Sequence, residues 1–197
     1  MTTTSSDQKA FVNSTFFRVV RKRFLATPLK FEQSMIGPSR WNTGAFPALY
    51  CCLAKNVATS VRLDLYDVDV DEARNIDPLN MPVLIEFRWS GSLFDLTTET
   101  GLQSVDLLAD YPEGHSDRGG SDTTRTIATD LYDNGNHGLV CRSASCFRLG
   151  NHNNWDGSSH DWSEVAIWPR QSGCNEPQYL GFSEPWALDA AIGANSV

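Results

Sequence analysis

Short blocks of apolar residues, separated by polar or glycine-rich segments, recur along the chain. These blocks are rich in Phe, Val, Ile, Leu and Trp, and most are shorter than ordinary helices, which favours β-strands. On this pattern we predict strands at 14–20, 48–53, 81–89 and 91–98, a strand followed by a turn at 138–145, and a last strand at 161–169.

Three other segments have the spacing or the end signals of helices. In 54–68 the apolar residues fall on one helical face, and 101–112 fits a short helix that ends at a proline. The segment 121–135 begins with an Asp or Thr that can cap a helix and ends at a glycine. Strands interleaved with a few helices predict an α+β fold, with a compact mixed β-sheet core and a few flanking helices.

The length of 197 residues suits one well-buried domain. We predict a polar tail at 1–12, the domain itself at 13–170 and a C-terminal tail at 171–197. The loop at 113–122 is glycine-rich and is interpreted as a lid or linker.

The charge balance excludes some classes of function. The formal net charge of −8 and the isoelectric point near 4.9 argue against nucleic-acid binding, although an acidic surface could meet a basic partner protein. No apolar run reaches membrane-spanning length, and the N-terminus lacks the apolar core of a secretory signal. We therefore expect no membrane contact and a cytoplasmic location, and an effector exported without a cleaved signal would share this pattern.

The cysteines favour a reducing compartment. There are five of them, an odd number, and none forms a Cys-x-x-Cys pair, so neither a disulfide framework nor a zinc site is expected. His152, Asp156 and His160 are spaced almost like metal ligands, but the Asn, Ser and Gly residues around them favour a loop. We expect no metal.

The most unusual segment is the loop GPSRWNTGAFPALY at 37–50, which combines Arg, Trp, Asn and Tyr. Arginine forms forked hydrogen bonds with phosphates, and aromatic rings offer faces on which a base can stack. The loop therefore suits a planar, anionic, aromatic ligand. The alternative is a Trp that fills the core and an Arg that pairs with a carboxylate.

This loop also resembles the glycine-rich signature of RES-domain proteins, in which G-x-R-W-N is followed by G-x-P-x-L-Y. Two more segments are similar to that family and occur in the same order: FFRVV at 16–20, with Arg18, and TRTIATDLYDNGNHGLVCRSAS at 124–145, with Ser143. The resemblance covers about residues 16–168. It implies a compact sheet core related to ADP-ribosyltransferases, with a cleft for NAD+.

The resemblance further implies an enzyme that cleaves the bond between nicotinamide and ribose in NAD+, by hydrolysis or phosphorolysis. NAD+ is then a substrate, and no cofactor is expected. Members of the family are often growth-arresting toxins held in check by an antitoxin or immunity protein, and a homo-oligomer is compatible with the sequence. The alternatives are transfer of ADP-ribose to a protein, a non-catalytic domain that binds a nucleotide or a partner, and a sugar- or protein-binding surface.

The residues expected at the site come from the three matched segments. Arg40 and Arg18 suit the pyrophosphate, and Tyr50 could stack on nicotinamide or lie in the core. Trp41 could stack on the ligand or be buried. Asn42 could bind the ligand, although fixing a turn suits it better.

Ser143 is expected to bond ribose or the nicotinamide amide, and an acid should complete the site. The family carries a glutamate about three helical turns after the tyrosine, but here Val61 or Arg62 stands at that place. Asp64, one turn further on, is the predicted replacement. Glu86 and Glu164 are further acids that no motif supports.

Overall fold

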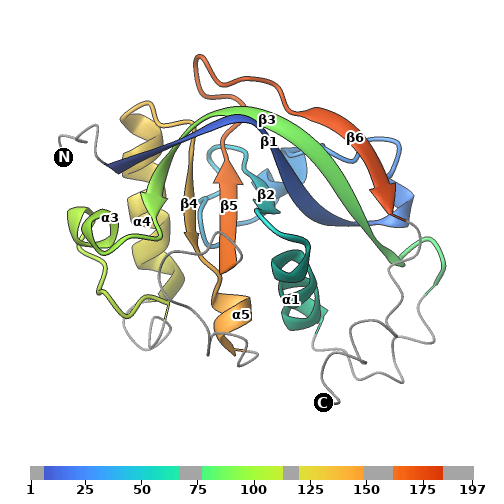
Figure 1. The fold of residues 1–197 in the computed structure, drawn as a ribbon, viewed down its shortest axis with the longest axis horizontal. Coiled ribbons are helices and arrows are strands. Elements are labelled where there is room, and N and C mark those ends of the chain that lie inside the picture. Colours follow the sequence, from blue (N-terminus) through green and yellow to red (C-terminus); the bar gives the residue numbers. More distant parts are fainter. Residues whose placement is uncertain (1–6, 67–76, 113–119, 149–161, 184–197) are drawn as a thin grey trace.

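Five strands close into a ring in the computed structural model, which describes residues 7–66, 77–112, 120–148 and 162–183 (Figure 1). Around the ring the order is β1 (Gln8–Arg21), β2 (Leu49–Cys52), β5 (Ser163–Ile167), β4 (Gly138–Arg142) and β3 (Pro82–Leu96), and β3 closes it by pairing with β1. The β3–β4 pair is parallel and the others are antiparallel, so the sheet is mixed. A further strand, β6 (Gln178–Ser183), pairs with β3 beside the ring.

The inside of the ring is filled by an apolar cluster to which all five strands contribute. Successive residues of a strand face opposite sides, so every second side chain points inward. Phe16 of β1 packs against Phe87 and Trp89 of β3, with ring centroids 5.6 and 6.0 Å apart. The other strands add Leu49, Cys51, Val140, Val165 and Ile167. The ring is therefore a small packed barrel with a side-chain core.

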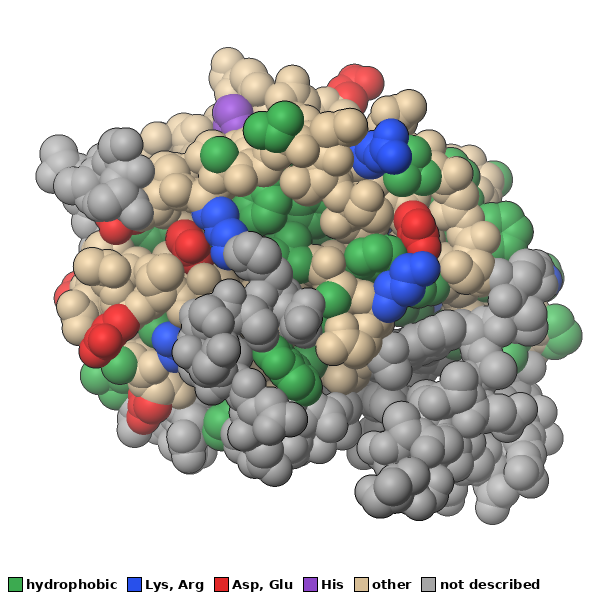
Figure 2. Space-filling view, in the orientation of Figure 1, with side chains coloured by type: hydrophobic (Ala, Val, Ile, Leu, Met, Phe, Trp, Pro, Cys, Tyr) green, Lys and Arg blue, Asp and Glu red, His purple; other side chains and the backbone are tan. Residues whose placement is uncertain are grey.

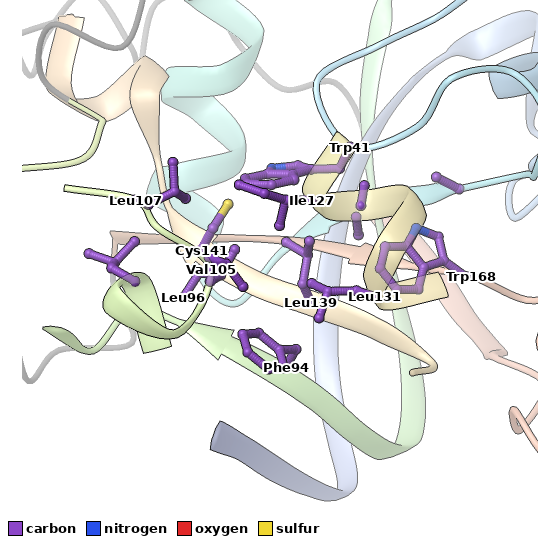
Figure 3. Packing of buried hydrophobic residues seen from close by; sticks show 14 of the residues in the cluster. Trp41, Phe94, Leu96, Val105, Leu107, Ile127, Leu131, Leu139, Cys141 and Trp168 are labelled. Carbon is purple, nitrogen blue, oxygen red and sulfur yellow. The ribbon is translucent and has the colours of Figure 1, made fainter. Parts of the chain in front are cut away.

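The outer face of the sheet is covered in two places. α3 (Glu99–Ser104), α4 (Gly120–Asp133) and the segment 41–48 pack over one part of it. Figure 3 shows the cluster that they form with the strands, which includes Trp41, Leu96, Ile127, Leu131, Leu139, Cys141 and Trp168. α1 (Lys55–Tyr66) and α5 (Ala144–Arg148) cover a second cluster, with Cys52, Val57, Ala58, Leu84 and Cys146.

The α+β class and the mixed sheet predicted from the sequence are confirmed, but one strand was wrongly divided. The segments 81–89 and 91–98 form the single strand β3, which continues through Gly91. A Cβ atom on Gly91 would lie 2.2 Å from Cη2 of Trp89, so glycine is needed there because the indole folds across it. The irregularity falls instead on β1, whose register with β3 shifts between Phe11 and Ser14.

The predicted ends of the domain also differ from the structure. Residues 8–12 belong to β1 and not to a polar tail, and the expected C-terminal tail contains β6. The helix predicted at 101–112 stops at Ser104, since Asp106 has a φ of 59° and Leu107 closes the helix end by donating to the Leu102 carbonyl. The short helix α5 was not predicted. Among the described residues, no helix is both long and apolar enough to cross a membrane.

Candidate functional site

The phenol of Tyr50 ties the loop before β2 to the sheet. Its oxygen accepts a hydrogen bond from the Trp41 backbone N–H at 2.9 Å and lies 2.5 Å from Oγ of Ser39. It also donates to Oδ1 of Asn42 at 3.2 Å. These contacts bracket Arg40 on both sides, so the backbone on either side of the arginine is fixed.

Asn42 holds the same loop from its other end. The side chain is fully buried, and its Nδ2 donates to the carbonyl oxygens of Ser34 at 2.7 Å and Phe46 at 3.3 Å. Its Oδ1 accepts from the hydroxyl groups of Ser39 and Tyr50. These hydrogen bonds and the complete burial of the side chain fix the loop and leave the amide turned away from solvent.

Arg40 meets Glu164, and Glu164 meets Ser143. The Arg40 Nη1 atom lies 3.2 Å from Oε2 of Glu164, and the Ser143 hydroxyl donates to Oε1 of the same carboxylate at 2.6 Å. The side chains of Arg40 and Glu164 are 23% and 15% exposed. Both ends of the carboxylate are therefore engaged, while part of the guanidinium still reaches solvent.

The register of the strands brings these residues together. Glu164 of β5 stands beside Cys52 of β2 and Cys141 of β4, and Tyr50 stands beside Ala166. Because Val165 points into the barrel, its neighbour Glu164 points to the outer face, as Tyr50 does. Ser143 follows β4 directly, where its Oγ also accepts from the Cys146 N–H at 3.1 Å at the start of α5.

The charges and pKa values of the group follow from burial and from the ion pair. Burial is the largest single effect and lowers the pKa of Arg40, but the Glu164 carboxylate together with Tyr111, Cys141 and Tyr50 raises that pKa above its usual range. Burial raises the pKa of Tyr50 to about 12, although its hydrogen bonds with Ser39 and Trp41 oppose the rise. The pKa of Cys141 rises to about 12, also by burial. At neutral pH the site thus holds a cation, a neutral phenol that can donate, and a protonated thiol.

A family model described as the RES domain matches residues 15–171, which is most of the chain and includes every residue of this group. The chain belongs to the RES family.

Among solved structures, the RES domain described here is similar to a chain in the crystal structure of the M. tuberculosis MbcT–MbcA toxin–antitoxin complex. The two are 13% identical, with a TM-score of 0.62, and the match covers 90% of this chain and 87% of that one. The ADP-ribosyltransferase-like α+β fold expected from the sequence is confirmed by this likeness. No curated protein matches the sequence.

The structure brings together Arg40, Tyr50 and Ser143, three of the residues that the sequence analysis assigned to the RES site. Trp41 belongs to the core alternative: it is 1% exposed and packs beside Tyr111, with ring centroids 6.1 Å apart (Figure 3). A ring so enclosed offers no free face, so stacking on a ligand is not supported for Trp41.

Arg18 does not share the site with Arg40. On β1 its neighbour Phe17 stands beside Cys52 and packs on the outer face, so Arg18 turns to the inner face, as Phe16 does. Arg18 interacts electrostatically with Cys51, which also faces inward. The structure therefore does not bring the two arginines together, because the sheet lies between them.

The acid that contacts both Arg40 and Ser143 is Glu164. Asp64 lies on α1, but its side chain is outside what the structure describes, so its predicted role is not tested. No motif marked Glu164, yet one signal was present in the sequence. It is a charged residue inside an otherwise apolar strand block, on the same face as Ala166 and opposite to Val165.

Sequence reasoning also passed over Arg125 of α4. Its Nε donates to the carbonyl oxygen of Ser39 at 3.2 Å, and its Nη1 pairs with Asp122 at 2.9 Å. The side chain is 26% exposed. Arg125 therefore places a second guanidinium next to the residue that precedes Arg40.

The histidines weighed as metal ligands, His152 and His160, lie outside the described residues together with Asp156. Among the residues that the structure does describe, no group of His, Cys, Asp or Glu side chains is arranged to hold a metal ion.

Proposed function

We propose that this RES domain is an NAD+-degrading enzyme that cleaves the bond between nicotinamide and ribose and acts as a growth-arresting toxin. The observation that carries the proposal is the contact of Arg40, Glu164 and Ser143 on one face of the sheet, beside the phenol of Tyr50. Membership of the RES family and the likeness to a chain of a toxin–antitoxin complex support it. An antitoxin or immunity protein is the partner that this function calls for.

Each group has a task that its position allows. The partly exposed guanidinium of Arg40, with Arg125 close to it, would hold the pyrophosphate by forked hydrogen bonds. Tyr50 keeps its proton well above neutral pH and would donate to the nicotinamide end or offer its ring. The Ser143 hydroxyl, one contact away from the acid, would bond the ribose.

Glu164 is proposed as the acid that takes the place of the missing glutamate. When the pyrophosphate engages Arg40, it competes with Oε2 of Glu164, which then becomes free to accept a proton. The C1′–N bond breaks and its electron pair leaves with nicotinamide, which becomes neutral. The oxygen of water joins C1′ and passes its proton to Glu164, giving ADP-ribose. In the phosphorolytic version, a phosphate oxygen attacks in place of water.

The test is release of nicotinamide from NAD+ by the purified protein, followed chromatographically with and without phosphate. We expect release in the wild type and a loss of at least 100-fold in kcat/KM for Arg40→Met and Glu164→Gln. Matched controls are Arg88→Met, an exposed arginine, and Glu86→Gln, a strand glutamate paired with Lys55 at 2.6 Å. Both controls should keep wild-type rates.

A second candidate is a domain that binds NAD+ without cleaving it. It is favoured by Val61 and Arg62 standing where the family has an acid, and by Glu164 being already engaged at both oxygens. Calorimetry with NAD+ separates the two. Binding that depends on Arg40 with no nicotinamide released over hours would establish the binding domain, and neither binding nor release would reject both.

A further inference from the structure

One guanidinium ties the segment 105–111, which follows α3, to the end of the sheet. Arg142 is the last residue of β4, and its Nε donates to the Thr97 carbonyl at 3.2 Å. Its Nη1 donates to the carbonyl oxygens of Ala109 at 2.5 Å and Tyr111 at 3.1 Å. The segment is neither helix nor strand, so Arg142 supplies donors that a regular element would otherwise provide.

This segment carries Tyr111 to the outer face of the sheet, beside the proposed site. Tyr111 is 2% exposed, and its ring centroid lies 6.1 Å from that of Trp41, the residue after Arg40. It belongs to the same apolar cluster as Cys141, which stands beside Glu164 across the β4–β5 pair. The Tyr111 phenol therefore lies in the surroundings of both members of the ion pair.

The electrostatics of Tyr111 agree with this placement. Burial raises the pKa of its phenol well above the ordinary value, and Cys141 and Glu164 add to the rise. The positive charge of Arg40 opposes it. A neutral phenol that excludes water strengthens the interaction of the guanidinium with the carboxylate next to it.

Arg142 is also joined to the proposed site through the chain. The next residue, Ser143, donates to Oε1 of Glu164 at 2.6 Å. Arginine carries five N–H donors in a planar fork, so one side chain can meet carbonyl groups from two parts of the chain. The same end of β4 thus fixes one residue of the site and the segment that packs beside it.

We propose that Arg142 is a positioning residue, which holds Tyr111 against the ion pair of Arg40 and Glu164 so that the pair keeps its geometry for the cleavage of NAD+. The three contacts of Arg142 described above go to backbone carbonyl groups, so it acts through the segment and not through the substrate. The part of this inference that concerns cleavage rests on the proposed function. The placement of Tyr111 by Arg142 is a property of the fold.

Nicotinamide release from NAD+ tests the part that concerns cleavage, at a temperature where circular dichroism shows every variant folded. Arg142→Met should lose about tenfold in kcat with KM within about twofold of the wild type, because the reacting groups are displaced while Arg40 remains. Arg142→Lys should recover most of the loss, since one ammonium can replace Nη1 at the carbonyls of Ala109 and Tyr111. The control is Arg88→Met, an exposed arginine that should keep the wild-type rate.

NMR of protein labelled with ¹³C at the tyrosine Cζ atoms tests the placement of Tyr111 without any substrate, and Tyr111→Phe identifies its signal. In the wild type and in Arg142→Lys the phenol should stay protonated up to about pH 11. In Arg142→Met it should ionise nearer to about pH 10, because the released segment lets water reach it. Tyr50, held by Ser39 and Trp41, should keep its raised pKa in all variants, which shows that the change is local.

Two results would overturn the inference. One is a loss of kcat in Arg142→Met that Arg142→Lys does not repair, and the other is a Tyr111 signal that titrates in Arg142→Met as it does in the wild type. If the wild type releases no nicotinamide, the proposed function fails instead. The titration of Tyr111 then decides alone whether Arg142 holds the phenol at the ion pair.

Discussion

The ion pair between Arg40 and Glu164 is largely buried, so each residue needs further contacts that hold it in place. Each charge is mostly removed from water, and each is costly there without its partner. The Ser143 hydroxyl occupies the second carboxylate oxygen, and the backbone around Arg40 is held by Tyr50 and Asn42. The geometry of the site therefore depends on residues that need not touch a ligand.

At this scale the first prediction is a double-mutant cycle. Glu164→Gln should lower the free energy of unfolding by about 2 kcal/mol, because a partly buried guanidinium loses its counter-charge. In an Arg40→Met background the same change should cost about 1 kcal/mol less, since no charge is left unpaired. Urea unfolding of the four proteins at pH 7 measures this, and strict additivity would show that the pair contributes no coupling.

Tyr50 gives a prediction that depends on pH. Its folded pKa of about 12 lies above the ordinary value of 10, mainly because of burial. A raised pKa means that its contribution to stability is complete below pH 10 and is lost as the pH rises towards 12. Tyr50→Phe removes the ionisable group, so the stability difference between wild type and variant should shrink between pH 10 and 12.

Urea unfolding at closely spaced pH values checks this difference. The other groups with raised pKa values, such as Tyr111 and Cys141, remain in both proteins and cancel in the comparison. A gap that stays constant up to pH 12 would mean that the Tyr50 phenol is not held in its neutral form by the fold.

At the scale of elements, the segment 37–48 acts as a rigid support for Arg40 although it contains no helix or extended strand. Asn42 replaces the missing ladder by donating to two carbonyl groups and accepting from two hydroxyl groups. Because this amide is fully buried and has this many partners, the conformation of the loop depends on it.

Asn42→Ala should therefore lower the stability by about 2 to 3 kcal/mol, because buried carbonyl groups lose their donor. If the proposed function holds, it should also reduce kcat for nicotinamide release at least tenfold at temperatures where the variant is folded. The neighbouring exposed Thr43 is the control, and Thr43→Ala should cost less than about 0.5 kcal/mol. Equal effects of the two changes would contradict a special role for Asn42.

The same elements show how far the sequence could lead. Short apolar blocks marked the strands at 48–53 and 161–169 closely, and end signals marked α4, because local chemistry decides these features. The loop motif singled out Arg40 and Tyr50, which the structure places together with Ser143. Which acid meets Arg40 could not be read in this way, since Glu164 is 124 residues further along and is placed by strand register alone.

The positions of Arg18 and Trp41 could not be read from the sequence for a related reason. The face to which Arg18 points depends on where β1 pairs with β2, and a shift of one residue would reverse it. The burial of Trp41 depends on α4 and on the segment after α3, which pack on it from other parts of the chain. Residue type suggested ligand contacts, but the tertiary arrangement decides which face each side chain reaches.

At the scale of the whole molecule, one layer of sheet separates the outer face, which carries the proposed NAD+ site, from the apolar interior of the barrel. The proposed NAD+ site lies beside α4 and the start of α5, while Arg18 turns to the inner face. Elsewhere on the surface seen in Figure 2, acidic and basic side chains are scattered singly or in pairs. The proposed NAD+ site therefore depends on a few partly buried charges, such as Arg40 and Glu164, more than on the net charge of the chain.

β6 allows a test of which part of the molecule carries the fold. It pairs with β3 but does not belong to the closed ring, and Tyr179, Leu180 and Phe182 on it are 38 to 43% exposed. A protein ending at Pro177 keeps the hydrogen bond from Trp89 Nε1 to the Asn175 carbonyl, at 2.9 Å. The segment before β6 therefore still covers the core at Trp89. We expect this shortened protein to unfold cooperatively, with a melting temperature lowered by several degrees.

The same shortened protein should keep the ion pair, because β5 and β4 hold Glu164 and Ser143 without help from β6. Its rate of nicotinamide release, measured at a temperature where it is folded, should then equal that of the full chain. Its newly exposed β3 edge should make it aggregate more readily at high concentration, which light scattering detects. Loss of cooperative unfolding would instead mean that the ring of five strands cannot stand alone, and that β6 is part of the core that supports the proposed site.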